Sequence, residues 1–154
     1  MQLLCDQMLA ELGRWLRAAG YDTEIAEPKA ADREILERAL RDKRLLLTRD
    51  RHFTEMKAPE GTIIFLKSNS LDECALELGK KLKLDWLYLP FSRCLICNSL
   101  LTNPDERTIA EQVPPDICSS SQQFRYCHSC NKVYWEGSHT DRMLQQLQRW
   151  QERS

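Results

Sequence analysis

The hydrophobic pattern of the first half of the chain changes repeatedly between a period typical of strands and one typical of helices. Short apolar runs indicate strands, and the run RLLLT at residues 44–48 contains three consecutive leucines with no polar residue between them. Such a run is expected of a parallel strand that is covered on both faces. Four strands are predicted in this way, over residues 2–5, 21–26, 44–48 and 61–67.

Between these runs, apolar residues recur every three or four positions, which indicates amphipathic helices. The first helix ends at Gly20, and its pattern places Arg14 and Arg17 on the polar side. The second helix covers residues 32–43. The face expected to be buried in the first helix consists of Met8, Leu12, Trp15, Leu16 and Ala19, and Glu34 and Arg38 are expected to form an i,i+4 ion pair in the second.

Two further helices are predicted, over residues 70–84 and 138–154. In the terminal helix, Ser138 and Asp141 have the spacing of a capping box. Its apolar stripe is predicted to contain Met143, Leu144, Leu147 and Trp150.

The regular alternation of strands and helices stops near Trp86. Over residues 1 to about 84 it predicts βαβ units, and therefore an α/β fold with a parallel sheet flanked by helices. Beyond that point Pro, Cys and turn residues become frequent. We expect a sheet-forming domain over residues 1–88, followed over residues 89–154 by a small cysteine-rich unit and the terminal helix.

Composition limits the possible partners and the compartment. The chain has 154 residues and a net charge of −1, so contact with nucleic acid would need a local basic patch. No stretch approaches the roughly 18 apolar residues of a membrane span, and the N-terminus has no basic leader, so we expect no membrane partner and no signal peptide. The seven cysteines are an odd number, which favours metal binding in a reducing, cytoplasmic environment over disulfides.

Three acidic residues are predicted to meet at one edge of the sheet. Asp6 follows the first strand, Asp50 follows the third, and Asp32 opens the second helix. Ligands of open α/β sheets bind at the carboxyl ends of the strands, where these three carboxylates would repel one another. A divalent cation would relieve that repulsion, and hard oxygen ligands suit Mg²⁺ or Mn²⁺. Such a site can activate water for attack on a phosphodiester.

Each acid also has a purely structural interpretation. Asp6 and Asp32 could cap their helices, and Asp50 could be a turn residue paired with a flanking arginine. A phosphoacceptor domain also gathers acids at strand ends, but it would need an acidic pair where this chain has Cys5–Asp6. Four arginines near the predicted edge could contact an RNA backbone or simply be solvated, namely Arg14, Arg17, Arg49 and Arg51.

Two C-x-x-C pairs give the most specific signal in the chain. Cys94 with Cys97, and Cys127 with Cys130, have the spacing that lets both thiolates of one turn face the same ion. Together they predict a closed, structural zinc site; a redox pair is the alternative. Basic and aromatic residues around these pairs could also contact RNA, namely Arg93, Arg125, Lys132, Tyr134 and Trp135.

Several segments resemble the PIN-like ribonuclease family known as the Mut7-C RNase domain, found at the C-terminus of the Mut-seven exonucleases. The similarity extends over nearly the whole chain. It rests on the two cysteine pairs and on the residues Asp6–Leu9, Leu12–Asp22, Asp32 with Ile35 and Leu36, Leu47–Arg51 and Val133–His139.

The resemblance implies a PIN-like fold with a C-terminal zinc ribbon and a metal-dependent ribonuclease activity on RNA. Carried over by motif, Asp6, Asp32 and Asp50 would be the acidic metal ligands. The chain departs from the pattern at His52, where many relatives have a further Asp, and it lacks a fourth acid. We therefore expect an endonuclease with a Mg²⁺ or Mn²⁺ site; the alternative is a non-catalytic, zinc-ribbon adaptor that binds RNA or the ribosome.

Overall fold

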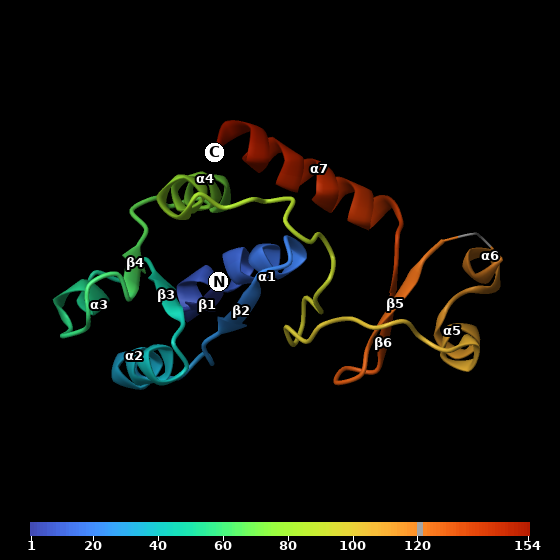
Figure 1. Ribbon diagram of the computed structural model, residues 1–154, viewed down its shortest axis with the longest axis horizontal. Helices are drawn as coiled ribbons and strands as arrows, with labels where there is room; N and C mark the ends of the chain where they lie inside the picture. Colours follow the sequence, from blue (N-terminus) through green and yellow to red (C-terminus); the bar gives the residue numbers. More distant parts are fainter. Residues whose placement is uncertain (120–121) are drawn as a thin grey trace.

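A four-stranded parallel sheet forms the core of the N-terminal part of the molecule (Figure 1). The computed structural model describes residues 1–119 and 122–154. The strands lie in the order β2-β1-β3-β4, so β1 and β3 are central. The prediction of four parallel strands is confirmed, with bounds β1 (Gln2–Cys5), β2 (Asp22–Ile25), β3 (Leu45–Thr48) and β4 (Ile63–Phe65).

Helices cover both faces of this sheet. Alternate residues of β1 explain why: Leu3 and Cys5 pack on one side and Leu4 on the other, and all three are fully buried. The first face is covered by α1 (Ala10–Ala18), α4 (Leu71–Leu82) and α7 (Ser138–Arg153), and the second by α2 (Asp32–Arg41) and the short α3 (His52–Glu55). The sequence pattern did not predict α3, which has a single buried residue, Phe53.

The C-terminal part contains an antiparallel hairpin and two short helices. The hairpin pairs β5 (Phe124–Cys127) with β6 (Lys132–Trp135). The short helices, α5 (Glu106–Gln112) and α6 (Pro115–Cys118), precede the hairpin. In the residues that the structure describes, no helix combines the length and apolarity needed to cross a bilayer.

The terminal helix α7 returns to the sheet and packs beside α4 (Figure 1). Its Trp150 is fully buried, with ring centroids 5.0 Å from those of both Trp15 and Trp86, and its Nε1 donates a hydrogen bond of 2.8 Å to Asp72. The two parts of the chain therefore share one hydrophobic core. The division at residue 88 stays a prediction.

Two expectations about α1 are wrong. Met8 is 60% exposed, because the chain enters α1 through a 3₁₀ turn, η1 (Gln7–Leu9), which buries Leu9 in its place. Arg17, expected on the polar side, is only 6% exposed. The first difference arises because a 3₁₀ turn does not follow the period of 3.6 residues. The second arises because the turn that carries Leu95 and Ile96 covers the Arg17 side chain and accepts its hydrogen bonds.

Two predicted helix-surface interactions are replaced by others. Arg38 pairs with Glu24 of β2 and with Glu27 instead of Glu34. Glu34 accepts a hydrogen bond from the backbone N–H of Ala31 at 3.4 Å. At the start of α7, the cap position is occupied by Gly137 and no side chain caps the helix, so the capping box expected from Ser138 is absent.

Candidate metal centre and candidate active site

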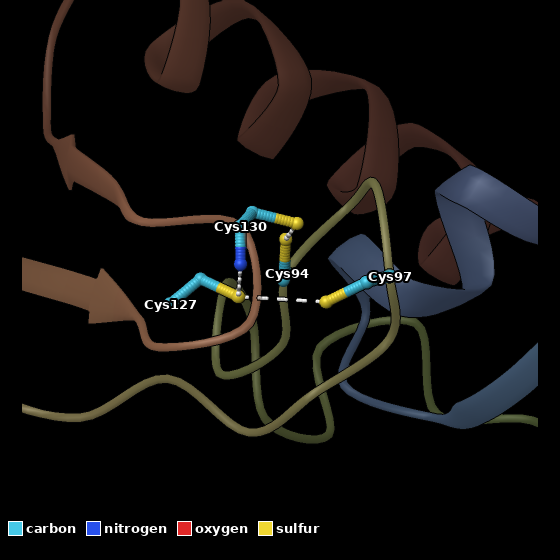
Figure 2. Close-up of side chains that lie close together, drawn as sticks. All are labelled: Cys94, Cys97, Cys127 and Cys130. Carbon is cyan, nitrogen blue, oxygen red and sulfur yellow. Dashed lines mark hydrogen bonds between the residues drawn. The ribbon is translucent and has the colours of Figure 1, made fainter.

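The two cysteine pairs converge on one point (Figure 2). Their four Sγ atoms all lie within 4.8 Å of one another. Across the pairs, Cys94 Sγ is 3.9 Å from Cys130 Sγ and Cys97 Sγ is 3.4 Å from Cys127 Sγ. Four sulfur ligands that surround one point fit a closed tetrahedral zinc site, which has a structural role. The predicted cysteine cluster is confirmed.

Tight backbone turns bring the cysteines of each pair together. In the first turn, the Cys94 carbonyl accepts a hydrogen bond of 2.9 Å from the N–H of Asn98, which has a φ of 74°. In the second, Cys127 Sγ accepts from the N–H of Cys130 at 3.4 Å, and Asn131 follows with a φ of 48°. Asparagine tolerates this left-handed conformation better than most residues, so its position after each pair matches the turn that the metal site needs.

The protein environment shifts the pKa values of the cysteine thiols in different directions. Burial raises the pKa of Cys97, but hydrogen bonds from the hydroxyl and the N–H of Ser99 outweigh it and lower that pKa to about 6. The hydrogen bond with Cys97 raises the pKa of Cys130 to about 12. A metal ion that binds four thiolates must displace the retained protons, so zinc affinity should rise with pH.

The first cysteine turn docks on the free edge of the sheet. Arg17 of α1 donates hydrogen bonds of 2.9 Å to the carbonyls of both Leu95 and Ile96, and one of 2.8 Å to that of Thr23 in β2. Asn98 accepts from the Thr23 N–H at 3.0 Å. Since β2 is an edge strand, these contacts satisfy backbone groups that a neighbouring strand would otherwise pair.

At the opposite end of α1, Asp6 is a buried carboxylate, 4% exposed, directly after β1. One of its oxygens accepts a hydrogen bond of 3.1 Å from the N–H of Leu9, which makes it the cap of η1, and the other accepts from the hydroxyl of Thr48. Burial raises the pKa of Asp6, although these hydrogen bonds oppose the rise. Asp6 therefore has the predicted cap role and also lies at the predicted edge.

Asp50 lies at the same edge, two residues beyond the end of β3. Its N–H donates to the Thr48 hydroxyl at 2.9 Å, and its carboxylate accepts from the N–H of His52 at 2.9 Å. In the described part of the chain, no arginine pairs with this carboxylate: the neighbouring Arg49 donates to Asn69 Oδ1 at 2.7 Å. The interpretation of Asp50 as an arginine-paired turn residue is therefore wrong.

Asp32 is the first residue of α2, after the cap position at Ala31. Its carboxylate lies 2.9 Å from Nδ1 of His52, and the two side chains are 37% and 60% exposed. This hydrogen bond raises the pKa of His52. His52 is thus paired with one of the predicted metal ligands.

We call the three acids Asp6, Asp32 and Asp50 the acidic rim. A continuous set of contacts links them: Thr48 joins Asp6 to Asp50, and His52 joins Asp50 to Asp32. Within residues 1–119 and 122–154, the cysteine cluster is the only group of three or more His, Cys, Asp or Glu side chains close enough to share one ion. The carboxylate chemistry of the rim suits Mg²⁺ or Mn²⁺. For all three acids to share a cation, however, their side chains would have to rearrange, and His52 would have to release Asp32.

Comparison with known proteins assigns the chain to a family. The family model described as the Mut7-C RNAse domain matches residues 1–147. The chain belongs to the Mut7-C RNAse domain family. The match runs through the sheet, the cysteine turns and most of α7, and it supports a nuclease-type activity with RNA as the substrate class. No curated protein and no solved structure matches the chain.

The four arginines proposed to contact RNA have different surroundings in this Mut7-C domain. Arg14 and Arg51 are exposed, and Arg49 is half-buried beside Asn69. Arg17 is committed to three carbonyls in the interior, so its guanidinium is not available to a phosphate. The expectation that Arg17 binds substrate does not agree with this burial.

Two residues that hold the acidic rim and the segment beside it in place were not identified from the sequence. Thr48 was predicted only as the end of a strand, although a hydroxyl closing a fully apolar run is itself a signal. Glu77 of α4 accepts hydrogen bonds from the N–H groups of Lys67 and Ser68 and from the Ser68 hydroxyl. Burial opposes these bonds, but they lower the pKa of Glu77 to about 2. Glu77 thereby fixes the segment that presents Asn69 to Arg49.

Proposed function

We propose that this Mut7-C domain is a metal-dependent endoribonuclease that hydrolyses RNA phosphodiester bonds at the acidic rim. The observation that carries the proposal is the contact network joining Asp6, Asp32 and Asp50 at the carboxyl edge of the sheet. The family match supports it, because it gives the domain as a ribonuclease.

The three carboxylates would hold Mg²⁺ or Mn²⁺, which when bound supplies a water activated for attack and a positive charge beside the phosphate. Thr48 fixes the carboxylate of Asp6 and the backbone of Asp50 relative to each other. Because these two acidic residues are already held in place, less conformational freedom would be lost when the metal ion and the RNA bind.

His52 would act beside the carboxylates. Its exposed ring pairs with Asp32 before the cation binds and would release Asp32 to the cation. The freed imidazole would then donate a ring N–H to a phosphate oxygen. The exposed Arg14 and Arg51 and the half-buried Arg49 would neutralise neighbouring phosphates.

The cysteine cluster would hold Zn²⁺ with a structural role. Four cysteines arranged as metal ligands fit a reducing, cytoplasmic environment.

The test is cleavage of a labelled single-stranded RNA and of a circular RNA by the zinc-loaded protein, with Mn²⁺ or Mg²⁺ added. Opening of the circle would identify an endonuclease. Asp50→Asn should abolish cleavage, whereas Asp116→Asn, an equivalent change at an exposed position on α6, should leave it unchanged. Equal cleavage by wild type and Asp50→Asn would refute the assignment.

A second function is favoured by the fact that Asp6 and Asp32 already have partners, Thr48 and His52. A rim satisfied without a cation fits a non-catalytic adaptor that binds RNA or the ribosome. RNA binding by the zinc-loaded wild type, without cleavage in either metal, would support the adaptor in place of the nuclease.

A further inference from the structure

A cleft of about 560 Å³ lies between the cysteine-rich unit and the first turn of α7, and no residue of the acidic rim lines it. Residues of β6 form one wall, and the segment that carries Leu95 and Ile96 forms another. Its volume is in the range of clefts that bind small molecules or parts of larger ligands. We call it the ribbon cleft.

Aromatic and basic side chains gather in the ribbon cleft. Tyr134 and Trp135 line it and are both partly exposed, and the Tyr134 hydroxyl lies 3.1 Å from Cys94 Sγ. Arg125 lies opposite Tyr134 in the hairpin register, and the Lys132 ammonium is 4.9 Å from the Tyr134 ring centroid. Opposed residues of a hairpin share one face, as do residues two apart, so Arg125, Lys132 and Tyr134 project to the same side. Trp135, one residue further on, projects to the other side, and the cleft is lined from both.

The charge in the ribbon cleft is positive. Among the described residues, none forms an ion pair with Arg125 or Lys132, and Glu136 is the one acid that lines the cleft. A third basic residue, Arg93, instead donates to the carbonyls of Gly20 and Asn98 and so supports the cysteine turn. Two exposed cations without ion-pair partners, beside partly exposed rings, match a polyanion that also carries flat apolar groups.

We propose that the ribbon cleft binds unpaired RNA, with a base stacked on Trp135 and phosphates at Arg125 and Lys132. Every base has a face that stacks on an aromatic ring, so such a site holds single strands with little sequence preference. The proposal rests on RNA being the substrate. It adds a binding site distinct from the acidic rim.

The position of the cleft determines which nucleotides it holds. Leu95 and Ile96 line it and touch Arg17 near the C-terminal end of α1, whereas Asp6 lies before the N-terminal end. The nine residues of α1 rise by about 14 Å. The cleft therefore holds nucleotides several positions from the phosphate at the rim, and RNAs too short to reach both sites should bind more weakly.

The test measures binding apart from cleavage. Zinc-loaded Asp50→Asn protein is titrated into a fluorescein-labelled oligouridine, and anisotropy is followed at several salt concentrations. Adding Arg125→Glu and Lys132→Glu should weaken binding at least about tenfold, and losing two phosphate contacts should reduce the slope of log affinity against log salt by about 1.4. The pair Lys80→Glu and Arg153→Glu makes the same change in net charge outside the cleft and should have little effect.

The aromatic contribution has its own variant. Trp135→Ala should weaken binding about 5- to 150-fold, as expected for loss of one stacked base. Zinc content and melting temperature show whether the hairpin remains folded. Trp135→Leu keeps an apolar side chain without a stacking face, so it should show a similar loss if stacking is the cause.

Each outcome decides one proposal. Wild-type affinity in the Arg125/Lys132 double variant and in folded Trp135→Leu would overturn the ribbon cleft as an RNA site. Competition by polyglutamate as strong as that by unlabelled oligouridine would also overturn it, in favour of an acidic peptide site. If the cleft variants lose RNA binding while the wild type never cleaves, the cleft stands and only the nuclease assignment falls.

Discussion

Replacing Thr48 with Val tests whether the acidic rim depends on one buried hydroxyl. Valine keeps the shape of threonine but removes the donor to Asp6 and the acceptor for the N–H of Asp50. A hydrogen bond to a charged group contributes about 1.5–3 kcal/mol, and water can reach the half-buried Asp50. We expect Thr48→Val to lower the free energy of unfolding by about 2–3 kcal/mol.

The loss should depend on pH in a defined direction. Burial raises the pKa of Asp6 in the folded protein, so the folded state holds its proton at a higher pH than the unfolded state does, and this group's contribution to stability falls as pH rises. Removing the Thr48 hydroxyl raises that pKa further. Thr48→Val should therefore cost more stability at neutral pH than at mildly acidic pH.

Urea denaturation of the zinc-loaded wild type and variant, compared at each pH, measures this difference, and comparison at equal pH cancels effects common to both. Thr48→Ser keeps the hydroxyl and should retain most of the stability. Thr54→Val removes an exposed hydroxyl that donates only to the Arg51 carbonyl, and should cost less than about 1 kcal/mol. A loss in Thr48→Val that is small, or that does not grow with pH, would refute the reasoning.

Three further predictions concern the cysteine unit and the histidine. Arg17→Met should lower the free energy of unfolding by about 2–4 kcal/mol, because it leaves three backbone carbonyls without their hydrogen-bond donor. Arg14→Met should have almost no effect in the same urea assay. Chelation of zinc should speed hydrogen exchange at the Thr23 amide, which donates to Asn98 in the first cysteine turn. An unchanged exchange rate would show that metal binding is not coupled to the stability of the sheet edge. Asp32→Asn should lower the pKa of His52 in an NMR titration, because it removes the carboxylate that favours the protonated ring; that pair's contribution to stability is present at low pH and is lost as pH rises through the folded pKa.

The docking of the cysteine unit gives the cysteine cluster a role beyond its own hairpin. An unpaired edge strand tends to pair with other chains, and β2 is shielded by contacts from Asn98 and Arg17. Gly20 is required beside this contact: its φ is 101°, and a Cβ there would lie 2.5 Å from the carbonyl oxygen of Leu89. The first cysteine turn, the segment at Leu89 and the sheet edge therefore pack against one another.

The sequence by itself determined the features that depend on neighbouring residues. Apolar runs and helical periods predicted the parallel strands and the main helices, because local periodicity decides which face of an element can be buried. The spacing of Cys94 with Cys97, and of Cys127 with Cys130, predicted a single cluster, because a two-residue gap lets one turn present both sulfurs. The strand-end positions of Asp6 and Asp50 predicted a shared edge.

Only the tertiary structure decided features that depend on which surfaces meet. Arg17 has the helical position of a solvated residue, yet it is buried, because the cysteine turn supplies carbonyls for its guanidinium. Trp150 lies near the end of the chain, yet it packs in the core with Trp15 and Trp86. The hydroxyl of Thr48 gains its role only once β1 and β3 lie side by side. Such contacts join residues far apart in sequence, so no local period records them; they follow from the packing of whole elements and from the need to satisfy every buried polar group.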